Sequence, residues 1–462
     1  MQLIGSDTHT LIIGLGKTGL SCARYLTDQG KSFAVADTRE TPPNLAAFQQ
    51  QYPGIEVRCG ALDTQWLARA NRLLVSPGVS RNEAAIVAAE QAGVEVLGDI
   101  DLFCQRVTAP IVAITGSNAK STVTTLVGEM AADAGVAVAV GGNLGTPVLD
   151  LLIGADKELY VLELSSFQLE TTEHLEAAAA TVLNISPDHM DRYADLPAYH
   201  RAKQRVYRNC KHAVFNLDDP LTRPLLSDAI PQIGFRLGKP DLQQFGLLQQ
   251  DGELFFAKGL APLMAVSRMK LGGGHNQANA LAALALGDAV GLPMASMLQT
   301  LEQFPGLEHR CQWLRDLDQV AYYNDSKGTN VGATLAAITG LGAELGGKII
   351  LIAGGDGKGA DFSALAEPMQ RWGRLALLIG RDAGAIEAAL NGAVGCERLA
   401  TLDAAVQAAQ QQAQPGDLVL LSPACASFDM FKGFEHRGQC FAESVQALVS
   451  GSGSGFVPGG QR

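Results

Sequence analysis

Residues 111–122 read IVAITGSNAKST, and this stretch decides the fold of the central part of the chain. The apolar run IVAI predicts a buried strand. Apolar side chains at i, i+3, i+4 and i+7 from Val123 predict a following helix with one apolar face, which we expect Gly135 to end. A strand, a short loop, Lys120-Ser121 and a helix together cradle phosphates, because loop amides and the lysine bind the phosphate oxygens.

This loop departs from the strict phosphate-binding pattern. Ile114 and Ala119 occupy the two positions where that pattern has glycine. A hydroxyl group of Ser121 or Thr122 is nevertheless expected to face magnesium.

Two further polar side chains follow strand-like runs in the same part of the chain. Glu163 lies in ELSSFQLE and His189 lies in NISPDHMDRY. Taken singly, Glu163 could pair with a lysine and His189 could cap the segment that begins at Pro187-Asp188. Their joint occurrence behind a phosphate loop favours a divalent metal site at the strand ends.

The N-terminal part contains a second glycine loop, GLGKTG at residues 14–19, and Asp37 closes the next strand-like run. A dinucleotide would place Asp37 on a ribose hydroxyl or Arg39 on a 2′-phosphate, whereas a tight turn without a ligand is the structural alternative. Since the next nucleotide-type unit begins at residue 111, a single nucleotide diphosphate fits better than a dinucleotide.

Polar clusters also follow strand-like runs beyond residue 305, namely NDSKGTN (324–330), GGDGKGADF (354–362) and SPACASFD (422–429). Successive strand ends form a binding rim, and lysines and hydroxyls suit an acidic substrate together with the phosphates of ATP. Serine, proline and aspartate are also ordinary turn residues, and this alternative is strongest for residues 422–429.

Short β-branched runs alternate with alanine-rich segments along the chain, which predicts an α/β fold with mostly parallel sheets. The length of 462 residues favours about three domains, with boundaries near Gly98 and Pro305-Gly306. The Asp251-Gly252 turn between alternating patches predicts a small antiparallel insertion at about residues 240–270.

The composition excludes some classes of function. Lys and Arg total 35 and Asp and Glu total 47, so the net charge is −12, which argues against nucleic-acid binding. No window approaches the roughly 18 to 20 apolar residues of a membrane helix, and the N-terminus lacks a signal-peptide pattern. We therefore expect a cytoplasmic protein with no membrane insertion.

Several motifs spread over residues 10–445 carry a family resemblance: TGSNAKST, GGNLG, ELSSFQLE, DHMDRY with RAKQRVY, GGGHNQAN, EHR, NDSKGTN, GGDGKGADF and SPACASFDMF. Together they resemble the motifs of the Mur ligases. The resemblance implies an N-terminal Rossmann-like domain for UDP (1–98), a central P-loop-type ATPase domain with a mostly parallel sheet (99–306) and a C-terminal Rossmann-like domain for the incoming amino acid (307–449). The linker-like composition of SGSGSGFVPGGQR separately predicts a flexible tail (450–462).

Within the family, the resemblance is to the ligases that add D-glutamate to UDP-N-acetylmuramoyl-L-alanine. It implies ATP-dependent amide-bond formation through an acyl phosphate, in an early cytoplasmic step of peptidoglycan synthesis. The implied partners are UDP-N-acetylmuramoyl-L-alanine, D-glutamate and ATP, and the implied cofactor is Mg²⁺, with one or two ions.

The resemblance also assigns site residues. The UDP substrate would contact Gly16, Lys17, Thr18, Asp37, Thr38, Arg39, Ser76, Gly78, Asn143 and His189. ATP would contact Gly116, Ser117, Asn118, Ala119, Lys120, Ser121, Thr122, Asn276, Asn279, Arg310, Asp325 and Lys327. D-Glutamate would contact Thr329, Lys358, Ser427, Phe428 and Phe434. The metal ligands would be Ser121, Glu163, His189 and Lys203, and the catalytic residues Lys120, Glu163, His189 and Lys203.

Three positions carry further family implications. The lysine that matches Lys203 is carbamylated in the family, which turns a cation into an anionic metal ligand. Ala119 replaces the usual glycine of the phosphate loop, so a positive φ there would cost roughly 1 kcal/mol. Gly328 replaces the usual alanine of DSKATN.

Three rival functions are compatible with parts of the sequence. Another ATP-dependent amide ligase would add L-alanine, a diamino acid or polyglutamate, although the D-N-P-R string of the diamino-acid ligases is absent. An NADP-dependent oxidoreductase would use the glycine loop at residues 14–19 and Arg39, and would leave Lys120 unexplained. The third rival is a non-catalytic nucleotide sensor, which is distinguished from the ligase by whether ATP hydrolysis needs a co-substrate.

Overall fold

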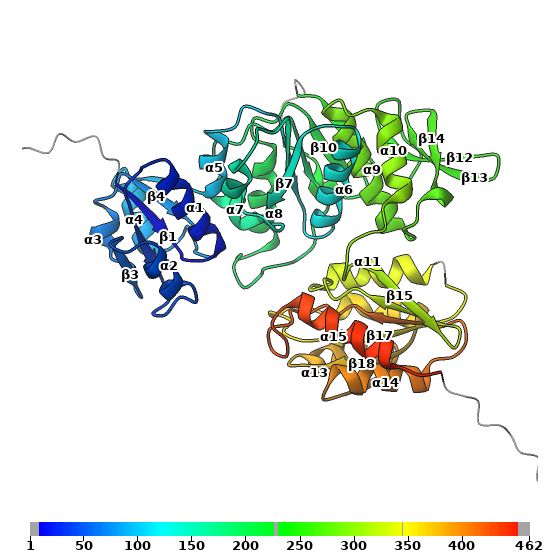
Figure 1. Cartoon of the computed structure of the whole chain (residues 1–462). Coiled ribbons are helices and arrows are strands. Elements are labelled where there is room, and N and C mark those ends of the chain that lie inside the picture. The colour runs from blue at the N-terminus through cyan, green and yellow to red at the C-terminus, as the bar shows by residue number, and fades with distance from the viewer. Residues whose placement is uncertain (1–8, 226–229, 344, 451–462) are drawn as a thin grey trace, which may run out of the picture. The chain divides into compact units, whose positions relative to one another are not determined.

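The structure is a computed structural model that describes residues 9–225, 230–343 and 345–450 of the chain. Figure 1 shows three groups of strands with their helices, coloured blue, cyan to green, and yellow-green to red along the chain. Each group forms its own sheet, and most strand pairs are parallel, which confirms the predicted α/β class. Residues 451–462 of the predicted tail lie outside the described residues.

The N-terminal sheet has five parallel strands in the order β3-β2-β1-β4-β5. β1 and β2 are buried along their whole length, as expected for apolar runs in a parallel sheet. The elements are β1 (Thr10–Ile13), α1 (Lys17–Asp28), β2 (Phe33–Asp37), α2 (Leu45–Gln51), β3 (Val57–Cys59), α3 (Thr64–Leu67), β4 (Arg72–Val75), α4 (Ala84–Gln91), β5 (Glu95–Leu97) and α5 (Asp99–Cys104).

The central sheet has nine strands in the order β14-β13-β12-β11-β10-β9-β6-β8-β7. Its elements are β6 (Ile111–Thr115), α6 (Lys120–Asp133), β7 (Val138–Gly142), β8 (Leu159–Glu163), α7 (Ser166–Glu170), β9 (Ala179–Val182), α8 (Leu196–Gln204), β10 (Ala213–Asn216), β11 (Gln232–Phe235), β12 (Phe245–Gln250), β13 (Glu253–Lys258), β14 (Ala261–Ala265), α9 (Gly274–Ala289) and α10 (Met294–Gln303). β6 lies between β8 and β9, and all three strands are fully buried. The carboxyl ends of β6, β7, β8 and β9 therefore meet at one edge of the sheet.

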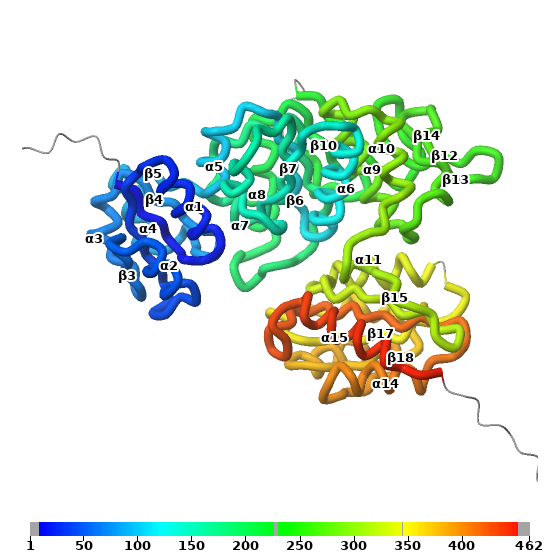
Figure 2. Tube along the Cα trace, in the orientation of Figure 1, coloured from blue at the N-terminus to red at the C-terminus, as the bar shows by residue number. Residues whose placement is uncertain are grey.

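The predicted antiparallel insertion is confirmed. β12, β13 and β14 pair antiparallel at one end of the central sheet. Asp251 and Gly252 form the turn between β12 and β13, both with positive φ (51° and 83°), as a tight hairpin requires. Figure 2 follows this narrow reversal along the backbone trace.

The C-terminal sheet has six strands in the order β15-β16-β20-β17-β18-β19, and only β15 runs antiparallel to its neighbour. Its elements are β15 (Gln312–Leu317), β16 (Val320–Asn324), α11 (Val331–Gly342), β17 (Ile349–Gly354), α12 (Ala366–Trp372), β18 (Gly373–Ile379), α13 (Ala383–Leu390), β19 (Gly395–Arg398), α14 (Leu402–Gln412), β20 (Leu418–Leu421) and α15 (Phe434–Ala447).

Alternate side chains of β17 enter two different apolar cores of this sheet. Ile349 and Leu351 pack with residues of α11, α12 and α13. Ile350 and Ile352 pack with residues of α14 and α15. This alternation places the two sets of helices on opposite faces of the sheet. The loops after β16, β17 and β20 meet at the carboxyl edge, where open α/β sheets bind ligands.

By its internal contacts the chain divides into two compact units. The first comprises residues 1–185, 197–269 and 278–304, and the second comprises residues 186–196, 270–277 and 305–462. The domain boundaries expected from the sequence stay a prediction. Among the described residues, no helix is both long enough and apolar enough to cross a bilayer.

Candidate active site

The N-terminal glycine loop joins β1 to α1 and lies at the carboxyl edge of its sheet. Gly14 has a φ of 101°, and a Cβ at Gly19 would collide with the carbonyl oxygen of Gly14. Both positions therefore require glycine. Ser76, at the end of β4, donates its hydroxyl to the same Gly14 carbonyl at 3.1 Å. Lys17, the first residue of α1, is exposed beside this loop.

Asp37 holds the N-terminal loop together from the end of β2. Its buried carboxylate accepts a hydrogen bond from the Leu15 N–H at 2.6 Å and two from the Arg39 guanidinium at 2.7 and 2.8 Å. Burial alone would raise the pKa of this carboxyl group, but the bonds from Arg39 and Leu15 outweigh it and hold the pKa below its usual value. The structure therefore brings Asp37 and Arg39 together as one charged pair beside the glycine loop.

The central phosphate loop connects β6 to α6 and contains a strained residue. Ala119 caps α6 in the left-handed conformation, with φ 66° and ψ −6°, which confirms that this position adopts a positive φ. The side chain of Asn184, which follows β9, accepts from the Asn118 N–H at 2.8 Å and donates to the Asn118 carbonyl at 3.2 Å. The neighbouring strand thus fixes the loop from both sides.

Two lysines converge on the backbone of this loop. Lys120 Nζ donates to the carbonyl oxygens of Gly116 and Ser117 at 2.8 and 2.9 Å. Lys203 Nζ, on α8, donates to the same Gly116 carbonyl at 2.8 Å, and Lys203 is only 1% exposed. The ring of Tyr199 lies one helical turn earlier, with its centroid 4.7 Å from Lys203 Nζ. Two ammonium groups at one carbonyl make this loop an anion-binding position.

Glu163 ends β8 at the same edge. Its buried carboxylate accepts a hydrogen bond from the Asn143 side chain at 2.7 Å, and the Asn143 N–H donates to the Glu163 carbonyl at 2.8 Å. The Ser121 hydroxyl at the start of α6 is also buried. One carboxylate and one hydroxyl are hard oxygen donors that fit Mg²⁺, which usually takes one or two protein ligands plus phosphates and water. Among the described residues no three His, Cys, Asp or Glu side chains cluster as metal ligands.

His189 belongs to the segment 186–196, which packs with the C-terminal unit. The preceding Asp188 accepts a hydrogen bond from the Asn330 side chain at 3.1 Å. Asn330 also caps α11 by accepting from the Ala333 N–H at 2.8 Å. The segment that carries His189 is thereby attached to the NDSKGTN loop.

At the carboxyl edge of the C-terminal sheet, Asp325 follows β16 and is nearly buried. It accepts from the Ser422 hydroxyl at 2.7 Å and from the Cys311 N–H at 3.2 Å. Burial raises the pKa of Asp325 to about 6, although these hydrogen bonds oppose the rise. A Cβ at Gly328 would lie 2.6 Å from the Asp325 carboxylate, so this departure from the family alanine leaves room for that carboxylate.

The residues predicted to bind D-glutamate surround the same edge. Lys358 follows β17 in the left-handed conformation (φ 52°), and Ser427 follows β20 and is buried. Phe428 is 76% exposed, and Phe434 begins α15 with its ring centroid 3.7 Å from Lys327 Nζ. Thr329 lies in the same loop as Lys327 and donates its N–H to the Lys327 carbonyl at 2.8 Å.

The other predicted residues occupy loops and helix ends. Thr38, Lys17 and Gly78 are exposed in the N-terminal unit, Gly16 and Thr18 are half-buried, and Thr122 is buried in the first turn of α6. Asn276 and Asn279 both lie on α9, in portions assigned to the second and the first unit respectively. Arg310 is half-buried and precedes β15.

One buried cation in this region was not predicted from the sequence. Arg437, on α15, is 1% exposed and donates from Nη2 to the carbonyls of Ser326 and Cys425 at 2.8 and 3.1 Å. Its Nη1 also reaches the carbonyls of Gly354 and Ala426 at 3.5 and 3.4 Å. Burial lowers its pKa to about 10, so the guanidinium stays charged at neutral pH. One side chain thus links the loops that follow β16, β17 and β20.

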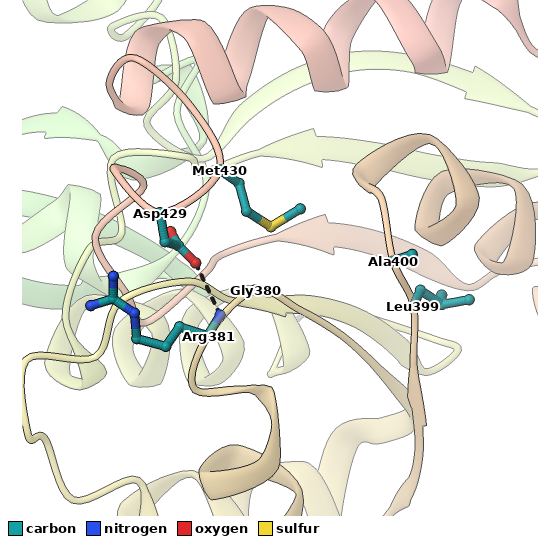
Figure 3. Close-up of a pocket in the computed structure, with 6 residues that line it drawn as sticks. All are labelled: Gly380, Arg381, Leu399, Ala400, Asp429 and Met430. Carbon is teal, nitrogen blue, oxygen red and sulfur yellow. Dashed lines mark hydrogen bonds between the residues drawn. The ribbon is translucent and has the colours of Figure 1, made fainter.

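Figure 3 shows a pocket of about 460 Å³ at the ends of β18, β19 and β20. Its lining comprises Gly380, Arg381, Leu399, Ala400, Asp429 and Met430. The Arg381 N–H donates to the Asp429 carboxylate at 3.0 Å, as the dashed line in Figure 3 marks. None of the residues assigned to a substrate lines this pocket, but Asp429 belongs to the predicted cluster 422–429, so the pocket adjoins the predicted rim at that residue.

The phosphate loop, its two lysines and the buried Glu163 define a nucleotide-binding protein of the phosphate-loop type. Three family models match the chain: the Mur ligase MurD-like N-terminal domain over residues 8–98, the Mur ligase middle domain over residues 114–287, and the Mur ligase glutamate ligase domain over residues 309–425. The chain belongs to the Mur ligase family, as its motifs predicted.

Curated relatives agree with the family models. UDP-N-acetylmuramoylalanine--D-glutamate ligase of Pseudomonas fluorescens Pf-5 is 60% identical over 449 residues, which are 97% of this chain and 100% of the relative. The proteins of the same name from Pseudomonas aeruginosa PAO1 and Marinobacter nauticus are 58% and 55% identical, with the same coverage.

Solved structures of Mur ligases share the fold. UDP-N-acetylmuramate-alanine ligase MurC from Thermotoga maritima has a TM-score of 0.59 and 18% identity, and the match covers 95% of this chain and 99% of that one. MurF from Acinetobacter baumannii has a TM-score of 0.59 and 16% identity, covering 94% and 90%. At these identities the likeness shows the α/β architecture alone.

Proposed function

We propose that this chain is the ATP-dependent ligase that joins D-glutamate to the carboxylate of UDP-N-acetylmuramoyl-L-alanine. The observation that carries the proposal is its 58–60% identity, over 97% of its length, to relatives named UDP-N-acetylmuramoylalanine--D-glutamate ligase. The converging Lys120 and Lys203 beside a buried Glu163 support the ATP part of the reaction. We place this reaction in the cytoplasm, where ATP and nucleotide-linked precursors are available.

The reaction needs two steps because a carboxylate resists attack by an amine. Transfer of the γ-phosphoryl group of ATP to the carboxylate makes an acyl phosphate and ADP. The amine of D-glutamate then attacks the acyl carbon, and the tetrahedral intermediate collapses to the amide with phosphate as the leaving group. Lys120 and the loop amides would hold the phosphates of ATP, a task of positioning and charge neutralisation.

The other predicted residues take their roles from this scheme. Asp37, Arg39 and the glycine loop at residues 14–19 would hold the UDP part, with Ser76 and Gly78 at the next strand end. Lys358, Thr329 and Ser427 would hold the two carboxylates of D-glutamate, with Phe428 and Phe434 beside them. We keep the domain boundaries near residues 98 and 306 as part of the proposal.

Ser121 and Glu163 would hold one Mg²⁺ ion, and His189 with Lys203 would hold a second. Bound Mg²⁺ would neutralise the charge of the transferring phosphoryl group. Carbamylation of the Lys203 ammonium group consumes CO₂ and releases two protons, one on forming the free amine and one on forming the carbamate, and it would replace a buried cation with an anionic oxygen donor. A carbamate signal in the ¹³C NMR spectrum under ¹³C-bicarbonate, lost in Lys203→Ala, is the expected result, and its absence in the wild type would contradict this modification.

The decisive experiment is phosphate release by the purified chain. It should require ATP, UDP-N-acetylmuramoyl-L-alanine and D-glutamate together. Replacing D-glutamate by L-alanine or a diamino acid should give no turnover above background. Turnover with one of those amino acids, or ATP hydrolysis without any amino acid, would refute the proposal.

Lys120→Ala tests the phosphate loop within this function. The variant should lose about a thousandfold or more in kcat, since one cation at the transferring phosphoryl group has this order of effect. Binding of the UDP substrate, measured by calorimetry, should be largely unchanged. Lys211→Ala removes an exposed lysine from the turn before β10 and should keep wild-type kcat.

A further inference from the structure

Asn324, the last residue of β16, is fully buried and its amide orientation is fixed by three hydrogen bonds. Its Oδ1 accepts from the Ser326 N–H at 3.1 Å. Its Nδ2 therefore points the other way, where it donates to the Gly438 carbonyl at 3.0 Å and meets Nδ1 of His309 at 3.1 Å. Neither the sequence analysis nor the proposed mechanism gave Asn324 or His309 a role.

These contacts determine the protonation of the His309 ring. An amide nitrogen is a donor only, so Nδ1 of His309 must accept and carry no proton. A neutral imidazole with an accepting Nδ1 has its proton on Nε2. Burial lowers the pKa of His309, although the charges of Glu308 and of Glu435 on α15 act to raise it. The lowered pKa keeps the ring neutral near pH 7.

The surroundings hold this ring in place. A Cβ at Gly438 would collide with Nδ1, so the helix α15 approaches the ring at a glycine. The ring of Phe434 packs edge-on, with centroids 6.3 Å apart. The backbone of His309 is bonded on both sides, because its N–H donates to Gln312 Oε1 at 3.1 Å and its carbonyl accepts from the Lys327 N–H at 3.0 Å.

The other ring nitrogen faces a different environment. Among the described residues, Asn324 is the hydrogen-bond partner of His309 Nδ1, and no side chain or backbone group bonds to Nε2. His309 is half-buried and adjoins Arg310 and Lys327, both predicted to contact ATP. The ring of Phe434 contacts both the His309 ring and Lys327 Nζ, so a neutral N–H donor in this surrounding suits an oxygen of an anionic substrate.

We propose that Asn324 is a positioning residue that fixes His309 as the Nε2–H tautomer, and that this N–H donates to an anionic oxygen of a substrate, either a phosphate of ATP or a carboxylate of D-glutamate. The substrate half rests on the proposed function. The tautomer half does not, because it follows from hydrogen bonds within the chain.

Ring-nitrogen NMR of the ¹⁵N-histidine-labelled full-length chain tests the tautomer directly. Loss of one signal set in His309→Gln identifies His309 among the eight histidines. We expect Nδ1 unprotonated and Nε2 protonated at pH 7. His212 provides the opposite reference in the same spectrum, because its Nδ1 lies 3.1 Å from the Ala178 carbonyl and must donate. A protonated Nδ1 on His309 overturns the proposal whatever the enzyme activity is.

Two matched variants test the donor. Glutamine places its amide N–H near the position of Nε2, and asparagine near that of Nδ1. His309→Gln should keep kcat/KM within about tenfold of the wild type, and His309→Asn should lose about a hundredfold. A rise in KM for ATP alone assigns the phosphate, and a rise for D-glutamate alone assigns the carboxylate. Equal activity of the two variants refutes the donor role.

Asn324→Asp tests the positioning. An aspartate at this place accepts from Nδ1–H, so the NMR signals of His309 should change to a protonated Nδ1 and kcat/KM should fall about tenfold or more. The pH profile of kcat/KM should also gain a titration absent from the wild type. Asn324→Asp with wild-type NMR signals of His309 contradicts the proposal, and absence of D-glutamate-dependent turnover in the wild type refutes the proposed function instead.

Discussion

The phosphate loop after β6 and the rim of the C-terminal sheet are fixed by contacts that differ in how far apart their residues lie in the sequence. In the phosphate loop, Lys120 and the strained Ala119 belong to the motif itself, and Lys120 donates to carbonyls only three and four residues away. Lys203 on α8 is the exception, because it reaches the same loop from 87 residues away. In the C-terminal rim, Arg437 donates to carbonyls of loops that are 11, 83 and 111 residues distant in the chain. The comparison teaches that one site is specified by a short motif, whereas the other depends on a few buried side chains that reach across the sheet.

The largest expected effect concerns Arg437. Arg437→Met keeps much of the side-chain volume but leaves buried carbonyls of Ser326 and Cys425 without their donor. It should lower the free energy of unfolding of the C-terminal unit by about 3 kcal/mol or more. Urea unfolding in a Trp66→Phe background measures this, since the remaining Trp313 and Trp372 both belong to that unit.

Arg398→Met is the matched control for Arg437→Met. Arg398 lies in the same sheet, is exposed and pairs with Glu387, so its loss should cost less than about 1 kcal/mol. If both substitutions lower the free energy of unfolding equally, the rim does not depend on the buried Arg437 more than on an exposed ion pair, and the contrast drawn above is wrong.

A second prediction uses His275, which lies in the same unit but lacks such links. Its Nδ1 is buried without a partner among the described residues, and burial lowers its pKa to about 4. Between pH 6.5 and 4 the unfolded chain binds a proton that the folded chain does not, so stability is lost as the pH falls through this window. Relative to His275→Gln, the wild type should lose about 2 kcal/mol between pH 7 and pH 4.5.

Urea unfolding of both proteins at several pH values measures this difference. If the difference in unfolding free energy between the wild type and His275→Gln stays constant from pH 7 to pH 4.5, the folded protein accepts the proton on His275 without a penalty. The unit would then tolerate a buried charge without the links that Arg437 has.

The smallest expected effect concerns Ala119. Ala119→Gly removes the left-handed strain and should stabilise the first unit by about 1 kcal/mol. Ala131→Gly, the same substitution at a buried position in the last turn of α6, should destabilise by about 1 kcal/mol or more. Thermal unfolding compares the two, and a destabilised Ala119→Gly would show that the loop is not strained at this position.

The local motifs were predictable from the sequence because their determinants lie close together. The runs FAVAD and IVAI became β2 and the start of β6, and the apolar face after Val123 became α6 with Gly135 beyond its end. The departure at Ala119 indicated strain only on the condition of a positive φ, and the structure shows that this condition is met. The order of strands within each sheet needed the structure, because strand pairing joins distant residues.

The buried links of the C-terminal rim could not be predicted in the same way. Asn324 and His309 are 15 residues apart, and nothing in either motif sets the orientation of an amide. Arg437 did leave a signal, since it shares a helix face with Phe441 and Val445, four and eight residues later, and all three are buried. An arginine on the apolar face of a helix indicates a buried cation, which needs acceptors such as backbone carbonyls.

The strained alanine of the phosphate loop has a genetic consequence. Every alanine codon becomes a glycine codon by changing its second base, so a single nucleotide substitution removes the strain. Random mutagenesis of the gene followed by selection for heat tolerance should therefore recover glycine at position 119 in the first round, before any change that needs two bases in one codon.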